Sequence, residues 1–279
     1  MSPKDDDPGL ASEIIAHYES MDEALRLEKP ENQIERLRTQ ELLHRFLPPP
    51  PAVILDIGGG AGVYAFWLAD RGYQVHLVDS VPLHISQAEE AARLRDGPPL
   101  ASIKLGDARQ VDHPESSVDG VLLLGPLYHL TERSDRIHAL REARRVLRPG
   151  GVIFAAAINR FASTIAALLE DFIADPKFMP IYEQDMRFGQ HRNPTGDPRF
   201  FTTAFFHYPQ ELIDEVEEAG FRFEILLAVE GPVRLLKDFE EQWSIPAIQE
   251  RIVRITRLVE SESTLWGVSP HIMAIGKKS

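Results

Sequence analysis

Glycines and carboxylates gather between residues 56 and 107, and these side chains have the clearest chemical potential in the chain. Asp56 precedes a loop with glycine at positions 58, 59, 60 and 62. Backbone without Cβ atoms lets a ligand approach closely, as happens where a strand turns into a helix. Asp79 and Asp107 each follow a short apolar run. Carboxylates at such strand ends can accept hydrogen bonds from ribose hydroxyls or from an adenine amine.

The spacing of the glycines differs from that of the dinucleotide-binding loop. That loop has the pattern G-x-G-x-x-G/A, which requires Gly or Ala at position 63, and Val63 stands there. The chain has G-x-G-x-G instead, with an acid two residues before the first glycine. A nicotinamide-dependent oxidoreductase is therefore the weaker interpretation of this loop.

Short apolar runs alternate with helical patterns around these residues. We expect strands at 53–57, 75–78, 102–105, 118–124 and 152–157, and helices at 63–69, 83–94 and 131–147, the last begun by a Thr131 cap. This alternation predicts a doubly wound α/β sheet. After it we expect a helix at 163–173, an irregular stretch at 175–209, a helix at 209–219 and strands at 221–229 and 271–275, with a helical insert between these two strands.

Composition excludes several classes of protein. Lys and Arg number 30 against 43 Asp and Glu, so the formal net charge is −13, which argues against a nucleic-acid partner. The chain has no cysteine, which excludes disulfides and thiolate metal sites, and we expect no metal. No apolar run approaches 18 residues and the N-terminus is polar, so we expect no membrane span or signal peptide and a cytoplasmic protein.

Several motifs in register carry a family resemblance. They are Asp56 with its glycine loop, Asp79, Gly106-Asp107-Ala108, Gly125-Pro126-Leu127-Tyr128-His129-Leu130 and Arg148-Pro149-Gly150-Gly151. Together they resemble the class I S-adenosylmethionine-dependent methyltransferases of the small-molecule type, most strongly over residues 52–157. The resemblance implies a Rossmann-like seven-stranded sheet whose seventh strand runs antiparallel beside strands five and six. It also implies S-adenosylmethionine as cofactor and S-adenosylhomocysteine as product.

We expect the chain to be divided into four parts. Residues 1–50 form a helical N-terminal lid, and 51–158 form the cofactor-binding core. Residues 159–208 form an acceptor-side insertion after strand five, and 209–279 complete the core with a helical insert. Pro48 to Pro51 separate the lid from the core.

Carried onto this chain, the family's pattern assigns cofactor-binding positions. The methionine part faces the first strand and its loop, the ribose faces the second strand, and the adenine faces the third. The cofactor-binding residues are Arg38 for the methionine carboxylate, then Asp56, Gly58, Gly60, Gly62, Asp79, Ser80, Asp107, Ala108 and Gly125. Gly59 departs from the pattern, because any residue is accepted at that position.

The acceptor side depends on fewer clues. In-line methyl transfer requires a nucleophile held near the methyl group, and a base where the acceptor must lose a proton. Tyr128 and His129 follow the fourth strand and are the predicted catalytic residues, while Tyr18, Tyr128 and His207 are the predicted substrate contacts. Aromatic residues are dense from 160 to 208, which is typical of a site for a planar or apolar molecule.

We therefore predict a methyltransferase acting on oxygen or nitrogen of a small molecule. The Asn/Asp-Pro-Pro-Phe/Tyr motif of nucleic-acid base and amide methylation is missing, since Gly125-Pro126-Leu127-Tyr128 stands in its place. The alternative from another class is a catalytically inactive cofactor-binding protein that acts as a regulator or partner. The acceptor's identity and the oligomeric state stay open.

Overall fold

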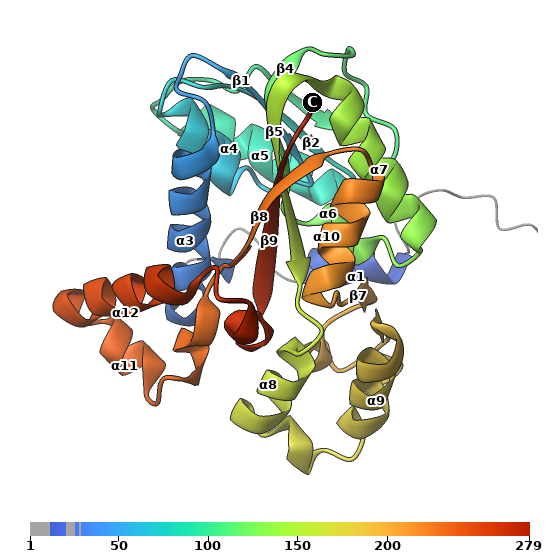
Figure 1. The fold of residues 1–279 in the computed structure, drawn as a ribbon, viewed down its shortest axis with the longest axis vertical. Helices are drawn as coiled ribbons and strands as arrows, with labels where there is room; N and C mark the ends of the chain where they lie inside the picture. Colours follow the sequence, from blue (N-terminus) through green and yellow to red (C-terminus); the bar gives the residue numbers. More distant parts are fainter. Residues whose placement is uncertain (1–11, 21–25, 28) are drawn as a thin grey trace, which may run out of the picture.

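A computed structural model describes residues 12–20, 26, 27 and 29–279, and a twisted sheet forms the centre of this part of the chain (Figure 1). Its seven strands have the order β3-β2-β1-β4-β5-β9-β8. Their bounds are β1 Val53–Ile57, β2 Gln74–Asp79, β3 Ser102–Leu105, β4 Val118–Leu123, β5 Leu147–Ile158, β8 Arg222–Ala228 and β9 His271–Lys277. Strands β1 to β5 are parallel, and β9 runs antiparallel between β5 and β8. The predicted sheet with an antiparallel seventh strand is confirmed.

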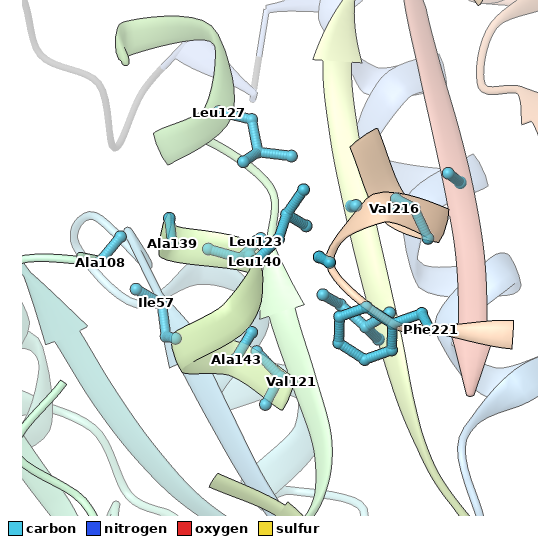
Figure 2. Packing of buried hydrophobic residues seen from close by; sticks show 14 of the residues in the cluster. Ile57, Ala108, Val121, Leu123, Leu127, Ala139, Leu140, Ala143, Val216 and Phe221 are labelled. Atoms are coloured by element: carbon cyan, nitrogen blue, oxygen red, sulfur yellow. The ribbon is translucent and has the colours of Figure 1, made fainter. Parts of the chain in front are cut away.

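Helices cover both faces of this sheet, which is why its strands are continuous apolar runs. Leu42 and Leu68 pack on one face of the sheet. Leu140 and Val216 pack on the other face, where Figure 2 shows them. The helix bounds are α3 Pro30–Phe46, α4 Val63–Ala69 and α5 Pro82–Leu94, then α6 Pro126–His129, α7 Arg133–Val146 and α10 Pro209–Glu218.

Two expectations about local structure were wrong. Helix α7 begins at Arg133 after Glu132, so Thr131 is not its cap. The stretch expected to be irregular contains α9 Phe178–Phe188, which carries Pro180 in its first turn. Proline is tolerated there because the first-turn N–H groups have no partner within the helix.

Around α9 the insertion has its own small framework. It comprises α8 Ala162–Leu169, the short 3-10 helices η1 Phe172–Ala174 and η2 Pro198–Phe200, and the two-stranded pair β6 Gln190–His191 with β7 Ala204–Phe205. The helical insert between β8 and β9 consists of η3 Gly231–Leu235, α11 Phe239–Trp243, α12 Pro246–Val259 and η4 Ser263–Val268. Over the residues described, no helix combines the length and apolar character needed to cross a bilayer.

The segment predicted to be a lid divides into two parts. Leu42 and Leu43 of α3 belong to the core beneath the sheet, and Ile34 packs with Trp243 and Ile252 of the helical insert. Helix α3 is therefore a core element. The remaining part comprises α1 Ser12–Ser20 and residues 26 and 27, while residues 1–11, 21–25 and 28 of the predicted lid lie outside the described residues.

Candidate active site

A cavity opens at the carboxyl ends of the parallel strands, where open α/β sheets bind their ligands. Residues of the β1–α4 loop, the ends of β2 and β3, and the turn after β4 border it together. The predicted site residues among its lining are Tyr18, Asp56, Gly58, Gly60, Asp79, Ser80, Asp107, Ala108, Gly125, Tyr128 and His129. The fold therefore brings most of the predicted site into one space.

The glycine loop is left-handed at three positions, with φ of +72° at Gly58, +57° at Gly60 and +92° at Gly62. A Cβ at Gly62 would lie 2.7 Å from the Phe66 ring, and Gly62 is absent from the cavity lining in the part of the chain that the structure describes. The turn into α4 therefore requires Gly62. A Cβ at Gly60 would meet no atom within 4 Å, so Gly60 leaves open space beside the loop for a ligand.

Asp79 ties the glycine loop to the end of β2. Its Oδ2 accepts from the backbone N–H of Gly60 at 2.8 Å, and its Oδ1 accepts from Val81 N–H at 2.8 Å and His84 Nδ1 at 3.1 Å. A carboxylate offers about four acceptor positions, so one position on Oδ2 stays available. One hydroxyl of a ribose can bind there directly, and a second requires Gly60 to release its bond.

Asp56, near the end of β1, is buried beside Asp79, with 1% of its surface exposed. Within the described chain its Oδ2 has no hydrogen-bond partner. Burial, and then the negative charge of Asp79, raise the pKa of Asp56 to about 7. The carboxyl group thus stands poised between its neutral and charged forms at the edge of the cavity, which suits a cationic ligand group.

Asp107 is held in place by Arg109, two residues further along the chain. The backbone N–H of Arg109 donates to Oδ1 of Asp107 at 2.7 Å, and its guanidinium donates to Oδ2 at 2.7 Å. The same guanidinium also binds Asp135 at 2.8 Å. Asp107 therefore presents a fixed carboxylate where β3 meets the cavity.

Tyr18 of α1 lies against His129, which follows β4. The Tyr18 hydroxyl lies 2.6 Å from Nε2 of His129, and the other ring nitrogen, Nδ1, lies 3.4 Å from the Thr203 carbonyl. A carbonyl only accepts, so Nδ1 carries the proton and Nε2 accepts from Tyr18. Burial lowers the pKa of His129 to about 4, so the ring is neutral at neutral pH. The Tyr128 ring packs edge-on against His129, with centroids 4.7 Å apart.

The structure places Arg38 away from the cavity, contrary to its predicted role. Its guanidinium is fully buried, binds Glu41 and Glu260, and donates to the Val229 carbonyl at 3.3 Å. Arg38 therefore joins α3 to Glu260 at the end of α12. The arginine of this segment that borders the cavity is Arg26.

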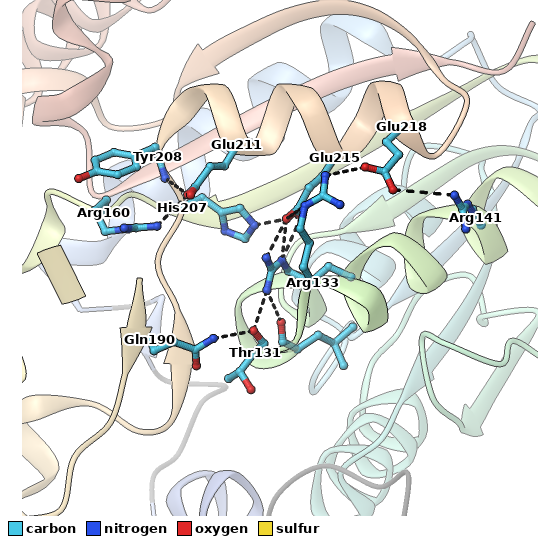
Figure 3. Close-up of polar contacts among 12 residues, drawn as sticks. Thr131, Arg133, Arg141, Arg160, Gln190, His207, Tyr208, Glu211, Glu215 and Glu218 are labelled. Atoms are coloured by element: carbon cyan, nitrogen blue, oxygen red, sulfur yellow. Dashed lines mark hydrogen bonds and ion pairs between the residues drawn. The ribbon is translucent and has the colours of Figure 1, made fainter. Parts of the chain in front are cut away.

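His207 is a second departure from the prediction. It is fully buried against α10, with Nε2 3.3 Å from Glu215, and Glu215 also binds Arg136 of α7 at 2.7 Å (Figure 3). This network fastens α10 to α7. Among the described lining residues of the cavity His207 is not present, so its predicted contact with a substrate is not supported.

The aromatic residues of the insertion pack mainly on one another. The ring centroids of Phe172, Phe178 and Phe200 lie 5.2 to 5.4 Å apart in a separate small core. Of residues 159–208, all of which the structure describes, none borders the cavity. The insertion contacts the site through Phe201 and Thr203, which lie against His129, and through Ala204 and Phe206, against which Tyr128 packs.

Sequence reasoning missed a group of polar residues at the end of the cavity away from Asp107. Arg26 donates two bonds to Glu35, at 2.8 and 2.9 Å, and Nδ1 of His271 lies 2.6 Å from Glu230. The ligand atoms of Glu35, Glu230 and His271 lie within 4.8 Å of one another, a spacing that a metal ion could use. These residues come from α3, the turn after β8 and the start of β9, so no local sequence signal links them.

Comparison with known proteins places these features in a wider group. The family described as "Methyltransferase domain" matches residues 54–151. The ubiquinone/menaquinone biosynthesis C-methyltransferase of Acidiphilium cryptum is 30% identical over 180 residues, which are 62% of this chain and 68% of that protein. The 27-O-demethylrifamycin SV methyltransferase of Amycolatopsis mediterranei is 33% identical over 35% of each chain.

The fold has close counterparts among solved structures. A SAM-dependent methyltransferase from Methanosarcina mazei superposes with a TM-score of 0.58 at 19% identity, covering 85% of this chain and 96% of the other. At this level of identity the likeness concerns the fold alone.

Proposed function

Because the chain belongs to the class I S-adenosylmethionine-dependent methyltransferases, we propose that it methylates a small-molecule acceptor at oxygen or nitrogen. The protein is an enzyme whose cofactor is S-adenosylmethionine. When bound, this cofactor supplies a methyl group already activated on a positively charged sulfur. What the chain must add is binding, orientation and exclusion of water.

The residues around the cavity suit the parts of this cofactor. Asp79 retains an acceptor position for a ribose hydroxyl, and the fixed carboxylate of Asp107 suits the adenine amine. The open side of Gly60 suits close approach of the ligand to the backbone. Buried Asp56 suits the cationic methionine end of the cofactor.

The observation that carries the acceptor proposal is the aromatic wall next to this cofactor space. Tyr18, Tyr128 and His129 border the cavity together, and Tyr18 holds the neutral His129 ring by its hydroxyl. Amphipathic rings of this kind suit a planar organic molecule with a polar group. The net charge of −13 also disfavours a polyanionic acceptor.

The names of two relatives bear on the acceptor. One relative is named as a methyltransferase of 27-O-demethylrifamycin SV, which supports a small organic acceptor here. The other is named as a C-methyltransferase of quinone biosynthesis, so carbon methylation is the second candidate. We favour oxygen or nitrogen because the chain offers bases beside the cavity that can remove an acceptor proton.

A radiolabelled methyl-transfer screen tests this proposal. The purified full chain is incubated with S-adenosylmethionine and a panel of phenols, hydroquinones, amines and carboxylates, and the products are located by mass spectrometry. Transfer to oxygen or nitrogen is the expected result, and Asp79→Ala serves as the cofactor-binding control. Micromolar cofactor binding without any transfer would favour an inactive cofactor-binding protein, and product methylated on carbon would favour the second candidate.

A further inference from the structure

His271 stands at the far end of the cavity as the first residue of β9. It pairs with Ile158, the last residue of β5. Its Nδ1 lies 2.6 Å from Oε1 of Glu230, a side chain that is 3% exposed. Glu230 is itself fixed, because Ser269 Oγ donates to it at 3.1 Å and the backbone N–H of His271 donates at 3.0 Å. The imidazole ring is therefore held in one orientation.

This arrangement leaves the second ring nitrogen available. Since the Glu230 carboxylate accepts from Nδ1, the neutral ring carries its lone pair on Nε2. The structure gives Nε2 no hydrogen-bond partner within the described chain, and the His271 side chain is 23% exposed and borders the cavity. A carboxylate on one nitrogen with the other facing a ligand space is the arrangement that activates histidine as a base.

The sheet order places His271 on the acceptor side of the cofactor. The adenosine residues Asp107 and Asp79 stand at the ends of β3 and β2, and the glycine loop follows β1. The next strand ends in the order are β4, β5 and β9. A cofactor lying from β3 to β1 leaves the ends of β5 and β9 to the acceptor.

The other two histidines of the cavity are less suited to take a proton. Nε2 of His129 already accepts the Tyr18 hydroxyl at 2.6 Å. His84 is bound through Nδ1 to Asp79 at 3.1 Å, so it lies at the ribose end. Of the three histidines in the described lining, only His271 combines a carboxylate partner with a position beyond the adenosine end.

We propose that His271 is the catalytic base, which accepts the proton of the acceptor's O–H or N–H at Nε2 while Glu230 holds the ring. The inference rests on the proposed function. As the acceptor atom bonds to the methyl carbon, the carbon–sulfur bond breaks and its electron pair stays on sulfur. The acceptor proton moves to His271, and the imidazolium later returns it to water.

The charges that face His271 set the pH at which it works. They come from Glu230 after β8, from Glu35 of α3, whose Oε2 lies 4.0 Å from Nδ1, and from Arg26 before α3. Burial opposes the charged ring, but Glu230 and Glu35 outweigh burial and raise the pKa of His271 above its usual 6.5. The neutral base therefore becomes available as pH rises, and the reaction rate has an acidic limb.

A metal ion held by Glu35, Glu230 and His271 is the competing interpretation. Both oxygens of Glu35 already receive the Arg26 guanidinium, and the Nδ1 position is taken by the bond to Glu230. A cation bound to Glu35 or to Nδ1 of His271 would have to displace these partners. Arg26 and His271 already compensate the charges of Glu35 and Glu230, so the structure favours a histidine base over a bound metal ion.

The first test is histidine imidazole NMR on the full chain loaded with S-adenosylhomocysteine. The expected result is an Nδ1–H tautomer for His271 and a titration that moves to lower pH in Glu230→Gln. His138→Gln, at an exposed position of α7, is the matched control and leaves this titration unchanged. An Nε2–H tautomer, no response to Glu230→Gln, or resonance shifts on adding Mg²⁺ or Zn²⁺ would overturn the inference.

The second test uses the phenol and amine panel of the transfer screen. His271→Gln and His271→Asn should lower kcat by about 10²- to 10⁴-fold with cofactor affinity retained. Glu230→Gln should move the acidic limb of kcat/KM to lower pH. Wild-type kcat in folded His271 variants, or loss of cofactor binding instead of kcat, would overturn the inference. If the wild-type protein methylates nothing in the panel, the proposed function fails, and the tautomer and the Glu230→Gln titration still decide the role of His271.

Discussion

Binding of S-adenosylmethionine should release a proton from Asp56. Burial and the charge of Asp79 raise the pKa of Asp56 to about 7, so about half of the molecules carry this proton at pH 7. The cofactor brings a positive sulfonium and an ammonium group, and positive charge nearby favours the ionised carboxylate. Binding should therefore release about half a proton per cofactor at pH 7, nearly one at pH 6 and almost none at pH 8.5.

The same linkage sets the sign of the pH effect on affinity. The bound pKa of Asp56 lies below the free value, so full affinity is present above about pH 7 and is lost as pH falls below it. With a bound pKa below about 5, the dissociation constant at pH 6 should be about tenfold larger than at pH 8. That ratio equals about 1.4 kcal/mol of binding free energy.

Isothermal titration calorimetry in buffers of different ionisation enthalpy measures the protons released. Asp56→Asn is the matched variant, because it keeps the size of the side chain and cannot titrate. S-adenosylhomocysteine is the matched ligand, since it lacks the sulfonium charge and should release fewer protons. Equal proton release by the wild-type protein and Asp56→Asn, or an affinity for S-adenosylmethionine that does not change between pH 6 and 8, would refute the reasoning.

Four further outcomes are expected. Asp79→Ala should weaken cofactor binding by about 1.5–3 kcal/mol in calorimetry, since it removes a charged acceptor, whereas Ala at the exposed Asp112 should leave binding unchanged. Gly60→Val and Gly150→Val both place a side chain at positive φ in open space. Each variant should therefore lose about 1–2 kcal/mol or more of folding stability. Only Gly60→Val should also abolish cofactor binding. Burial opposes ionisation of Glu35, yet mainly Arg26 and His271 hold its pKa at about 2. Arg26→Gln should therefore lower the free energy of unfolding by roughly 3 kcal/mol at pH 7, and by less as pH falls from 4.5 toward 2. Chemical denaturation checks this, with Arg93→Gln, which removes an exposed ion pair, as the control. Tyr18→Phe should speed amide hydrogen exchange in α1. S-adenosylhomocysteine should slow amide exchange in α1 of the wild-type protein. An exchange rate that does not change on adding the ligand would mean that α1 is permanently docked.

The local sequence determined the α/β frame and the cofactor end of the site. Strand β1, helix α4 and strand β3 begin and end where their apolar runs and glycines predict. Parallel strands joined by helices bring their carboxyl ends to one edge, so Asp56, Asp79 and Asp107 meet without further information. The glycine loop was expected to let a ligand approach the backbone closely, and Gly60 leaves open space for that approach.

Only the tertiary structure decided which polar side chains complete the site. Arg38 and Arg26 belong to the same leading segment, and the packing of α3 against the helical insert sends Arg38 to Glu260 and leaves Arg26 at the cavity. His207 satisfies Glu215 under α10, whereas His271 reaches the cavity from the start of β9. A charged residue has many possible partners along a chain, and which one it meets depends on elements far apart in sequence that fold against each other.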